Sequence, residues 1–337
     1  MTVLVTGATG FLGSALVPEL LNHQQSVHIF VRDEKKAHQQ FGNTVTISRG
    51  DITDELHLQR VVKGCTTIYH LAGRLYHPSI PEEVYRNTHV EGTRALMKAC
   101  QGQSQIQRIV YVSTTGVYGN TGDTPAGEDA SFAPTNSYEI TKLEGEQLAL
   151  KAYREQGLPV TVVRPGLVYG PGDLHLLDFF ISINKGLFHV IDGGRSLLHP
   201  VYIDDLVAAL LLCAAQSKSY GRSYNIAGER PVTVRELATT IAHALGRELP
   251  AGSIPLWLAN LASDIFAVVP WIDDEHAPLT RSRIKFLTNN RSYDISRARS
   301  ELGYIPRIGL EAGMKLTVAW YYKHRYIGNS SSSGRTV

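Results

Sequence analysis

Three glycines near the amino terminus constrain the fold of this chain most. Gly7, Gly10 and Gly13 stand three residues apart, after the apolar run of residues 2–5 and at the start of a helical pattern over residues 11–21. A strand, a glycine-rich turn and a helix in this order can bind the pyrophosphate of a dinucleotide, because the helix N-terminus attracts anions. A side chain at the first or second glycine would keep the backbone away from the pyrophosphate, and the third permits close packing of helix on strand.

Short β-branched runs alternate with helical patterns through the first half of the chain, which is typical of a doubly wound parallel sheet. The sequence therefore predicts an α/β fold, a Rossmann sheet with a smaller C-terminal α+β substrate domain. We expect strands at residues 2–5, 26–31, 45–48, 67–70, 108–112 and 160–164, and the clearest helices at residues 11–21, 82–100 and 137–155.

The pattern changes after residue 165, and this change predicts the domain boundaries. Residues 1–165 form the expected dinucleotide-binding domain, to which residues 199–227 return. Residues 166–198 and 228–328 form the expected substrate domain. The Ser-rich residues 329–337 have nothing to bury and are expected to be a disordered tail.

Composition excludes several classes of function. The 337 residues carry a net charge of only +2 without a basic stripe, which argues against a nucleic-acid partner. The three cysteines lie far apart with no metal-ligand spacing, so we expect reduced thiols and no metal. The apolar stretch at residues 254–272 is too short and too polar to span a bilayer, and residues 2–5 already form a strand in place of a signal peptide. We expect a cytoplasmic enzyme with a small-molecule substrate; a homodimer is compatible with the sequence, which does not decide the oligomeric state.

A tyrosine and a lysine four residues apart predict the chemistry. Tyr138 and Lys142 lie on one face of the expected helix, so their polar ends can converge. A nearby ammonium and the positive charge of an oxidised nicotinamide both stabilise a phenolate, and we therefore expect Lys142 and the oxidised cofactor together to lower the pKa of Tyr138. The hydroxyl run Ser113, Thr114 and Thr115 ends a predicted strand, and one of these hydroxyls can hold a substrate oxygen.

This ordered set resembles the short-chain dehydrogenase/reductase superfamily, and the spacing of the glycines is typical of it. The blocks at residues 117–119, 164–173, 199–206 and 293–304 resemble the extended members, which belong to the NAD-dependent epimerase/dehydratase superfamily. The branch that the chain resembles most is that of 3β-hydroxysteroid dehydrogenases and dihydroflavonol reductases.

The resemblance implies roles for particular residues. Tyr138, Lys142 and Thr114 are the implied catalytic residues, with Ser113 and Thr115 as rivals for the position of Thr114. The implied cofactor contacts are Gly7, Thr9, Gly10, Phe11, Leu12, Gly13, Arg32, Asp51, Ile52, Leu71, Ala72, Gly73, Ser113, Tyr138, Lys142, Pro165 and Leu167.

The end of the second strand bears on the choice of cofactor. Arg32 suits the 2′-phosphate of NADP, because the donors of a guanidinium match phosphate oxygens. Asp33 lies about 20 residues past the glycines, where an acid that binds the ribose of NAD is expected. We favour NADP and keep NAD as the alternative.

Departures from the sugar-nucleotide enzymes indicate an apolar substrate. Leu167 and Leu198 stand where those enzymes carry an Asn and an Arg that contact the sugar nucleotide, although Arg195 is a possible substitute. His89 stands where the family often has the Asn of a proton relay. Residues 254–272 are interpreted first as a core helix, and as a lid or a peripheral membrane patch in the alternative.

The sequence thus predicts an NADP(H)- or NAD(H)-dependent oxidoreductase that interconverts a secondary alcohol and a ketone on a mainly apolar small molecule. A nucleotide-sugar epimerase or dehydratase is the alternative enzyme. A non-catalytic dinucleotide sensor is the alternative of another class, against which the intact pair of Tyr138 and Lys142 argues.

Overall fold

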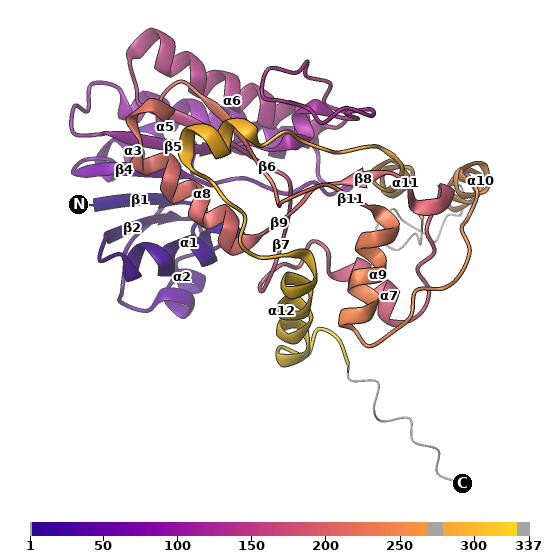
Figure 1. The fold of residues 1–337 in the computed structure, drawn as a ribbon. Helices are drawn as coiled ribbons and strands as arrows, with labels where there is room; N and C mark the ends of the chain where they lie inside the picture. Colours follow the sequence, from indigo (N-terminus) through magenta and orange to yellow (C-terminus); the bar gives the residue numbers. More distant parts are fainter. Residues whose placement is uncertain (1, 268–278, 329–337) are drawn as a thin grey trace. The chain divides into compact units, whose positions relative to one another are not determined.

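A computed structural model describes residues 2–267 and 279–328 of the chain. These residues form two compact units (Figure 1). The first comprises residues 2–166, 204–227 and 291–305, and the second comprises the other described residues. The expected tail at residues 329–337 lies outside the described residues.

The first unit is built on a parallel sheet, which has seven strands among the described residues, in the order β10-β6-β5-β4-β1-β2-β3. Its strands are β1 (Thr2–Thr6), β2 (Ser26–Val31), β3 (Thr46–Arg49), β4 (Cys65–His70), β5 (Arg108–Val112), β6 (Val160–Pro165) and β10 (Ser223–Ile226). The strand order reverses between β1 and β4, and doubly wound sheets bind their ligands at the carboxyl ends of strands at such a switch point. The predicted fold class is confirmed.

Helices cover both faces of this sheet (Figure 1). On one face lie α1 (Phe11–Asn22), α2 (Glu34–Phe41) and α8 (Ile203–Ala215). On the other, α3 (Glu55–Val61), α5 (Gly92–Cys100) and α6 (Ser137–Gln156) pack side by side. The helix predicted over residues 82–100 differs from one regular helix: α4 (Glu82–Arg86) runs through a π-helical segment, η1 (Asn87–Glu91), into α5.

Local capping explains why α6 has the expected bounds. The side chain of Asn136 accepts a hydrogen bond from the backbone N–H of Glu139 at 3.0 Å, which satisfies a free donor of the first turn. Gly157 ends the helix in the left-handed conformation, with φ of 70°. This 20-residue helix carries both predicted catalytic side chains.

Residues 291–305 belong to the first unit, although we assigned them to the substrate domain. Side chains hold them against the end of β10: the Tyr224 hydroxyl donates to Glu301 at 2.7 Å, and the Tyr304 hydroxyl donates to the carbonyl of Ala227 at 2.9 Å. The segment includes a π-helical turn, η5 (Ala298–Leu302). Its place depends on contacts about 80 residues apart in sequence, which the local pattern does not reveal.

The second unit combines short strands with helices. Strand β7 (Leu167–Tyr169) pairs with β9 (Pro200–Tyr202) in parallel, and β8 (Leu197–Leu198) pairs with β11 (Val232–Thr233) antiparallel. Its helices are α7 (Leu177–Asn184), α9 (Val234–Ala244), α10 (Leu256–Ala267), α11 (Arg281–Thr288) and α12 (Leu310–Lys323). Helix α9 packs against α7 and α12.

Helix α10 is not the core helix that we expected. Its apolar side chains are exposed to solvent, including Trp257 at 68%, Ile265 at 53% and Leu261 at 49%, while Ala259 is buried. The rest of the predicted stretch, residues 268–272, lies outside the described residues. Among the helices that the structure describes, none has both the length and the apolar character needed to cross a bilayer.

Candidate active site

The glycine turn forms a cradle between β1 and α1. Gly7 has φ of +73°, and a Cβ at this position would lie 2.7 Å from the backbone of Leu71 and Ala72. A Cβ at Gly13 would lie 2.5 Å from the backbone of Ala8, so this glycine permits the close packing of helix on strand. Gly10 is exposed and precedes α1 without a side-chain cap. The uncapped N-terminus of α1 and the glycine backbone of the turn fit a pyrophosphate.

The other predicted contacts of the turn have partly accessible side chains. Thr9, Phe11 and Leu12 are half-buried. The crowding at Gly7 shows a role that sequence reasoning missed, because this glycine must also let the loop after β4 pass against β1.

The charged side chains that follow β2 and β3 differ in exposure and in their hydrogen bonds. Arg32 is exposed, whereas the carboxylate of Asp33 accepts a hydrogen bond from the backbone N–H of Lys36 at 2.9 Å and caps α2. Asp51 accepts two hydrogen bonds from Thr53, which lower its pKa, and the charge of Arg32 lowers it further. Arg32 and Asp51 are therefore near enough to interact.

Ile52 and the loop after β4 present mainly backbone. The Ile52 side chain packs into the core against Gly92, where a Cβ would lie 2.6 Å away. Leu71 and Ala72 are half-buried and Gly73 is exposed. The backbone N–H of Leu71 donates to the carbonyl of Thr6 at 3.2 Å, which fixes the start of the loop on β1.

Tyr138 is half-buried, and the hydroxyl of Thr114 is close enough to affect its titration. Burial raises the pKa of Tyr138 to about 12, and the hydroxyl of Thr114 opposes this rise. The lowering expected from Lys142 together with an oxidised nicotinamide stays a prediction. The ammonium of Lys142 donates to the carbonyl of Val112 at the end of β5, and burial dominates the shift in the pKa of Tyr138.

Lys142 is almost fully buried, with 5% of its surface exposed. Burial lowers its pKa to about 8, and the attraction of Glu146, one helical turn further along α6, opposes this. The ammonium also lies 4.9 Å from the ring centroid of Tyr111. Lys142 thus keeps a charge near neutral pH within an apolar environment.

The three hydroxyls after β5 have different partners. The hydroxyl of Thr115 donates to the carbonyl of Pro165 at 2.9 Å and is thereby occupied. The hydroxyl of Thr114 accepts from the backbone N–H of Gly116 at 3.1 Å and also meets Tyr138. The buried hydroxyl of Ser113 has no hydrogen-bond partner among the described residues. This geometry favours Thr114 over both rivals as the partner of Tyr138.

An ion pair beneath α6 was missed by sequence reasoning. Arg164, 3% exposed, hydrogen-bonds to the buried carboxylate of Glu146 and to the hydroxyl of Tyr118. Glu146 follows Tyr138 and Lys142 at the same four-residue spacing, and this periodicity was the available signal. The pair links α6 to β6.

Four further residues from the sequence analysis belong to the second unit or to its border. Pro165 is buried at the end of β6 and offers its carbonyl to Thr115. Leu167 begins β7 in the second unit and is half-buried, and Leu198 is buried in β8. Arg195 is exposed. The roles of these residues toward a ligand stay predictions.

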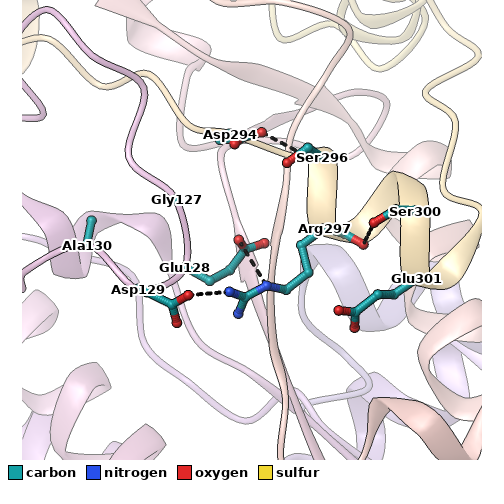
Figure 2. A pocket seen from close by; sticks show the side chains of 9 residues that line it. All are labelled: Gly127, Glu128, Asp129, Ala130, Asp294, Ser296, Arg297, Ser300 and Glu301. Atoms are coloured by element: carbon teal, nitrogen blue, oxygen red, sulfur yellow. Dashed lines mark hydrogen bonds and ion pairs between the residues drawn. The ribbon is translucent and has the colours of Figure 1, made fainter.

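A polar hollow elsewhere in the first unit has about 350 Å³ of volume (Figure 2). Arg297 reaches across it, with a hydrogen bond to Asp129 and with its Nε 3.6 Å from Glu128. Its lining includes none of the predicted catalytic or cofactor residues. Of the carboxylates that line it, Asp294 accepts from the backbone N–H of Ser296 and Glu301 accepts from the hydroxyl of Tyr224.

Comparison with known proteins identifies the family. Residues 3–227 match the model of the NAD dependent epimerase/dehydratase family. The chain belongs to this family. It is an extended short-chain dehydrogenase/reductase, and the resemblance stated from the sequence is confirmed.

Its relatives include enzymes of different substrates. The 3beta-hydroxysteroid-dehydrogenase/decarboxylase isoform 1 of Arabidopsis thaliana is 28% identical, over 94% of this chain and 78% of its own length. The 2-alkyl-3-oxoalkanoate reductase of Shewanella oneidensis is 28% identical, over 92% of this chain and 84% of its own. MoeE5, solved in complex with UDP-glucuronic acid and NAD, is 29% identical with a TM-score of 0.74, over 96% of this chain and 100% of that chain.

Proposed function

We propose that this enzyme interconverts a secondary alcohol and a ketone on a mainly apolar small molecule, with NADP(H) as the preferred cofactor. The nearness of the Thr114 hydroxyl to Tyr138, with the buried ammonium of Lys142 one turn further along α6, carries this proposal. It joins a proton donor, a hydroxyl that can orient an oxygen, and a cation that stabilises a phenolate.

Each residue has a defined part in moving the proton. With its pKa raised to about 12, Tyr138 is protonated at neutral pH and can donate to the oxygen of a ketone. Thr114 holds that oxygen, and Lys142 stabilises the phenolate that remains. The bound nicotinamide supplies the hydride in reduction and accepts it in oxidation. In the oxidative direction the phenolate of Tyr138 takes the proton of the alcohol.

Two kinds of observation support an apolar substrate. Leu167 and the buried Leu198 provide no charge for a diphosphate, which needs paired cations once it leaves water. Two relatives of this chain are named for activity on a steroid and on an alkyl-substituted oxoalkanoate, both rich in hydrocarbon.

The preference for NADP rests on the ends of β2 and β3. The carboxylate of Asp33 caps α2, so it is less suited to bind ribose hydroxyls. Arg32 is exposed and its charge acts on Asp51, and an exposed guanidinium at this strand end is available to a 2′-phosphate.

A nucleotide-sugar epimerase or dehydratase is the second candidate, because the similar MoeE5 was solved with UDP-glucuronic acid. In that case the exposed Arg195 is the expected ligand of the diphosphate. Purified enzyme incubated with lipophilic ketones, lipophilic alcohols and UDP-sugars separates the two, when nicotinamide absorbance and sugar isomers are followed together. Sugar epimerisation without net cofactor consumption would reject the ketone proposal.

The catalytic assignment is tested by Tyr138→Phe. We expect turnover to fall by about 10²- to 10⁴-fold, because general acid catalysis is lost, with cofactor affinity unchanged within a few-fold. Tyr153→Phe is the matched control, since Tyr153 lies on the same helix and is 37% exposed. A Tyr138→Phe enzyme with the wild-type rate would refute the assignment.

A further inference from the structure

His89 occupies an unusual place in the helix that precedes β5. It lies in the π-helical segment η1, where the backbone widens by one residue per turn, and such segments occur often at functional sites. Helix α6 approaches this segment closely, because a Cβ at Gly145 would lie 2.3 Å from the carbonyl oxygen of His89. The imidazole itself is buried, with 1% of the residue exposed.

The hydrogen bonds of His89 define its tautomer. Its Nε2 accepts from the backbone N–H of Arg74 at 3.0 Å, so this nitrogen carries no proton. Its Nδ1 lies 2.9 Å from the hydroxyl of Thr141, which itself donates to the carbonyl of Ser137 at 2.6 Å. Nδ1 therefore donates, and the ring is neutral. Burial and the charge of Lys142 lower the pKa of His89 to about 2, in agreement with this assignment.

The two partners of His89 belong to the two halves of the candidate site. Arg74 follows directly on Leu71, Ala72 and Gly73, the loop that is expected to meet the cofactor. Thr141 lies on α6 between Tyr138 and Lys142.

The ring of His89 also meets Tyr138 nearly edge-on, with centroids 5.6 Å apart. His70 supports the same loop from β4: its Nδ1 lies 2.7 Å from the hydroxyl of Thr6, and that hydroxyl accepts from the backbone N–H of Ala72 at 3.3 Å.

We propose that His89 is a positioning residue that fastens the cofactor loop to the catalytic helix, through Arg74 on one side and Thr141 on the other. Both nitrogens of this neutral ring are hydrogen-bonded, so the ring fixes the spacing between Arg74 and Thr141. It does not exchange protons with solvent. The catalytic consequence rests on the proposed function, whereas the effect on cofactor binding does not.

Two amide variants separate the two bonds. The oxygen of His89→Gln can reach the position of Nε2 and accept from Arg74, whereas the amide group of His89→Asn can reach only the position of Nδ1 and donate to Thr141. His89→Leu removes both bonds. The matched control is His23→Gln, because His23 is a solvent-exposed histidine in the same unit. Cofactor affinity is measured by NADPH and NADH fluorescence without turnover, and kcat and KM are measured with the best ketone.

We expect His89→Leu and His89→Asn to weaken cofactor binding by about tenfold to hundredfold, because a buried N–H of the loop loses its acceptor. His89→Gln should bind the cofactor within about threefold of the wild type, because its oxygen restores the acceptor for the backbone N–H of Arg74. The kcat of His89→Leu should fall while KM for the ketone changes little. Wild-type affinity in a folded His89→Leu protein, or equal affinities of the Gln and Asn variants, would overturn the proposal.

A spectroscopic measurement tests the tautomer independently of these variants. In protein labelled with ¹⁵N-histidine, long-range ¹⁵N–¹H spectra should show a ring protonated at Nδ1 that does not titrate between about pH 5 and 8. A ring that titrates near neutral pH would instead make His89 a proton carrier and overturn its purely positioning role. Failure of Tyr138→Phe to lose turnover would reject the proposed function and leave the affinity pattern of the His89 variants intact.

Discussion

The buried ammonium of Lys142 should destabilise the nucleotide-free protein, and Lys142→Met should relieve this. Burial lowers the pKa of Lys142 from an ordinary 10.5 to about 8. This difference corresponds to about 3 kcal/mol lost by the folded state wherever the lysine is charged in both states. Methionine keeps the length of the side chain without its charge. Glu146 keeps its partner in the variant, because Arg164 pairs with it.

The expected gain at about pH 7 is roughly 2 kcal/mol, because the lost hydrogen bond to the carbonyl of Val112 takes back about 1 kcal/mol. The gain in stability of Lys142→Met must shrink as the pH rises. As the pH rises from about 8 to 10.5, the folded protein releases the proton of Lys142 while the unfolded chain keeps it. The wild type therefore gains stability over this range, and the difference between the two proteins closes.

Urea unfolding of both proteins without nucleotide, followed by circular dichroism at about pH 7 and about pH 10, measures this difference. Lys151→Met is the matched control on α6, because Lys151 is 58% exposed, and its stability should stay within about 0.5 kcal/mol of the wild type. Two results would refute the reasoning. One is a Lys142→Met protein less stable than the wild type at pH 7, and the other is a stability difference that does not change with pH.

Three further predictions concern catalysis and the cofactor. Ketone reduction should slow as the pH rises through about 8, because Lys142 loses the charge that stabilises the phenolate of Tyr138; the pH profile of kcat/KM measures this, and a rate independent of pH up to 9 would contradict it. Gly7→Ala should abolish cofactor binding in a titration, because its φ of +73° and the backbone 2.7 Å away leave no room for a Cβ, and a variant of wild-type affinity would contradict the reading of the turn. Arg32→Ala should weaken NADP by about tenfold to hundredfold and leave NAD nearly unchanged, since a charge-assisted hydrogen bond contributes about 1.5–3 kcal/mol. Equal losses for both nucleotides would show that Arg32 does not select the phosphate.

Features that depend on near neighbours in sequence were predictable. The parallel α/β fold followed from alternating patterns, and the observed sheet confirms it. The bounds of α6 followed from Asn136 at its start and Gly157 at its end, because capping is a property of the first and last turns. The four-residue spacing of Tyr138 and Lys142 likewise placed both side chains on one face of a helix before any tertiary contact was known.

The choice among equivalent residues needed the tertiary structure. Ser113, Thr114 and Thr115 look alike in sequence, and their partners come from elsewhere in the chain: Pro165 engages Thr115, and Tyr138 engages Thr114. The rise in the pKa of Tyr138 needed the tertiary structure for the same reason, because burial is set by all the elements that surround a side chain.

The sequence by itself determined the local devices of this protein: a glycine turn that leaves a helix N-terminus bare, and a helix that aligns a tyrosine with a lysine. Only the tertiary structure decided how His89 joins the loop after β4 to α6, and why residues 291–305 pack beside β10. Local devices depend on steric and hydrogen-bonding preferences within a few residues. The contacts of His89 and of residues 291–305 depend on which strands become neighbours in the sheet. This order brings together groups that lie dozens of residues apart in the sequence.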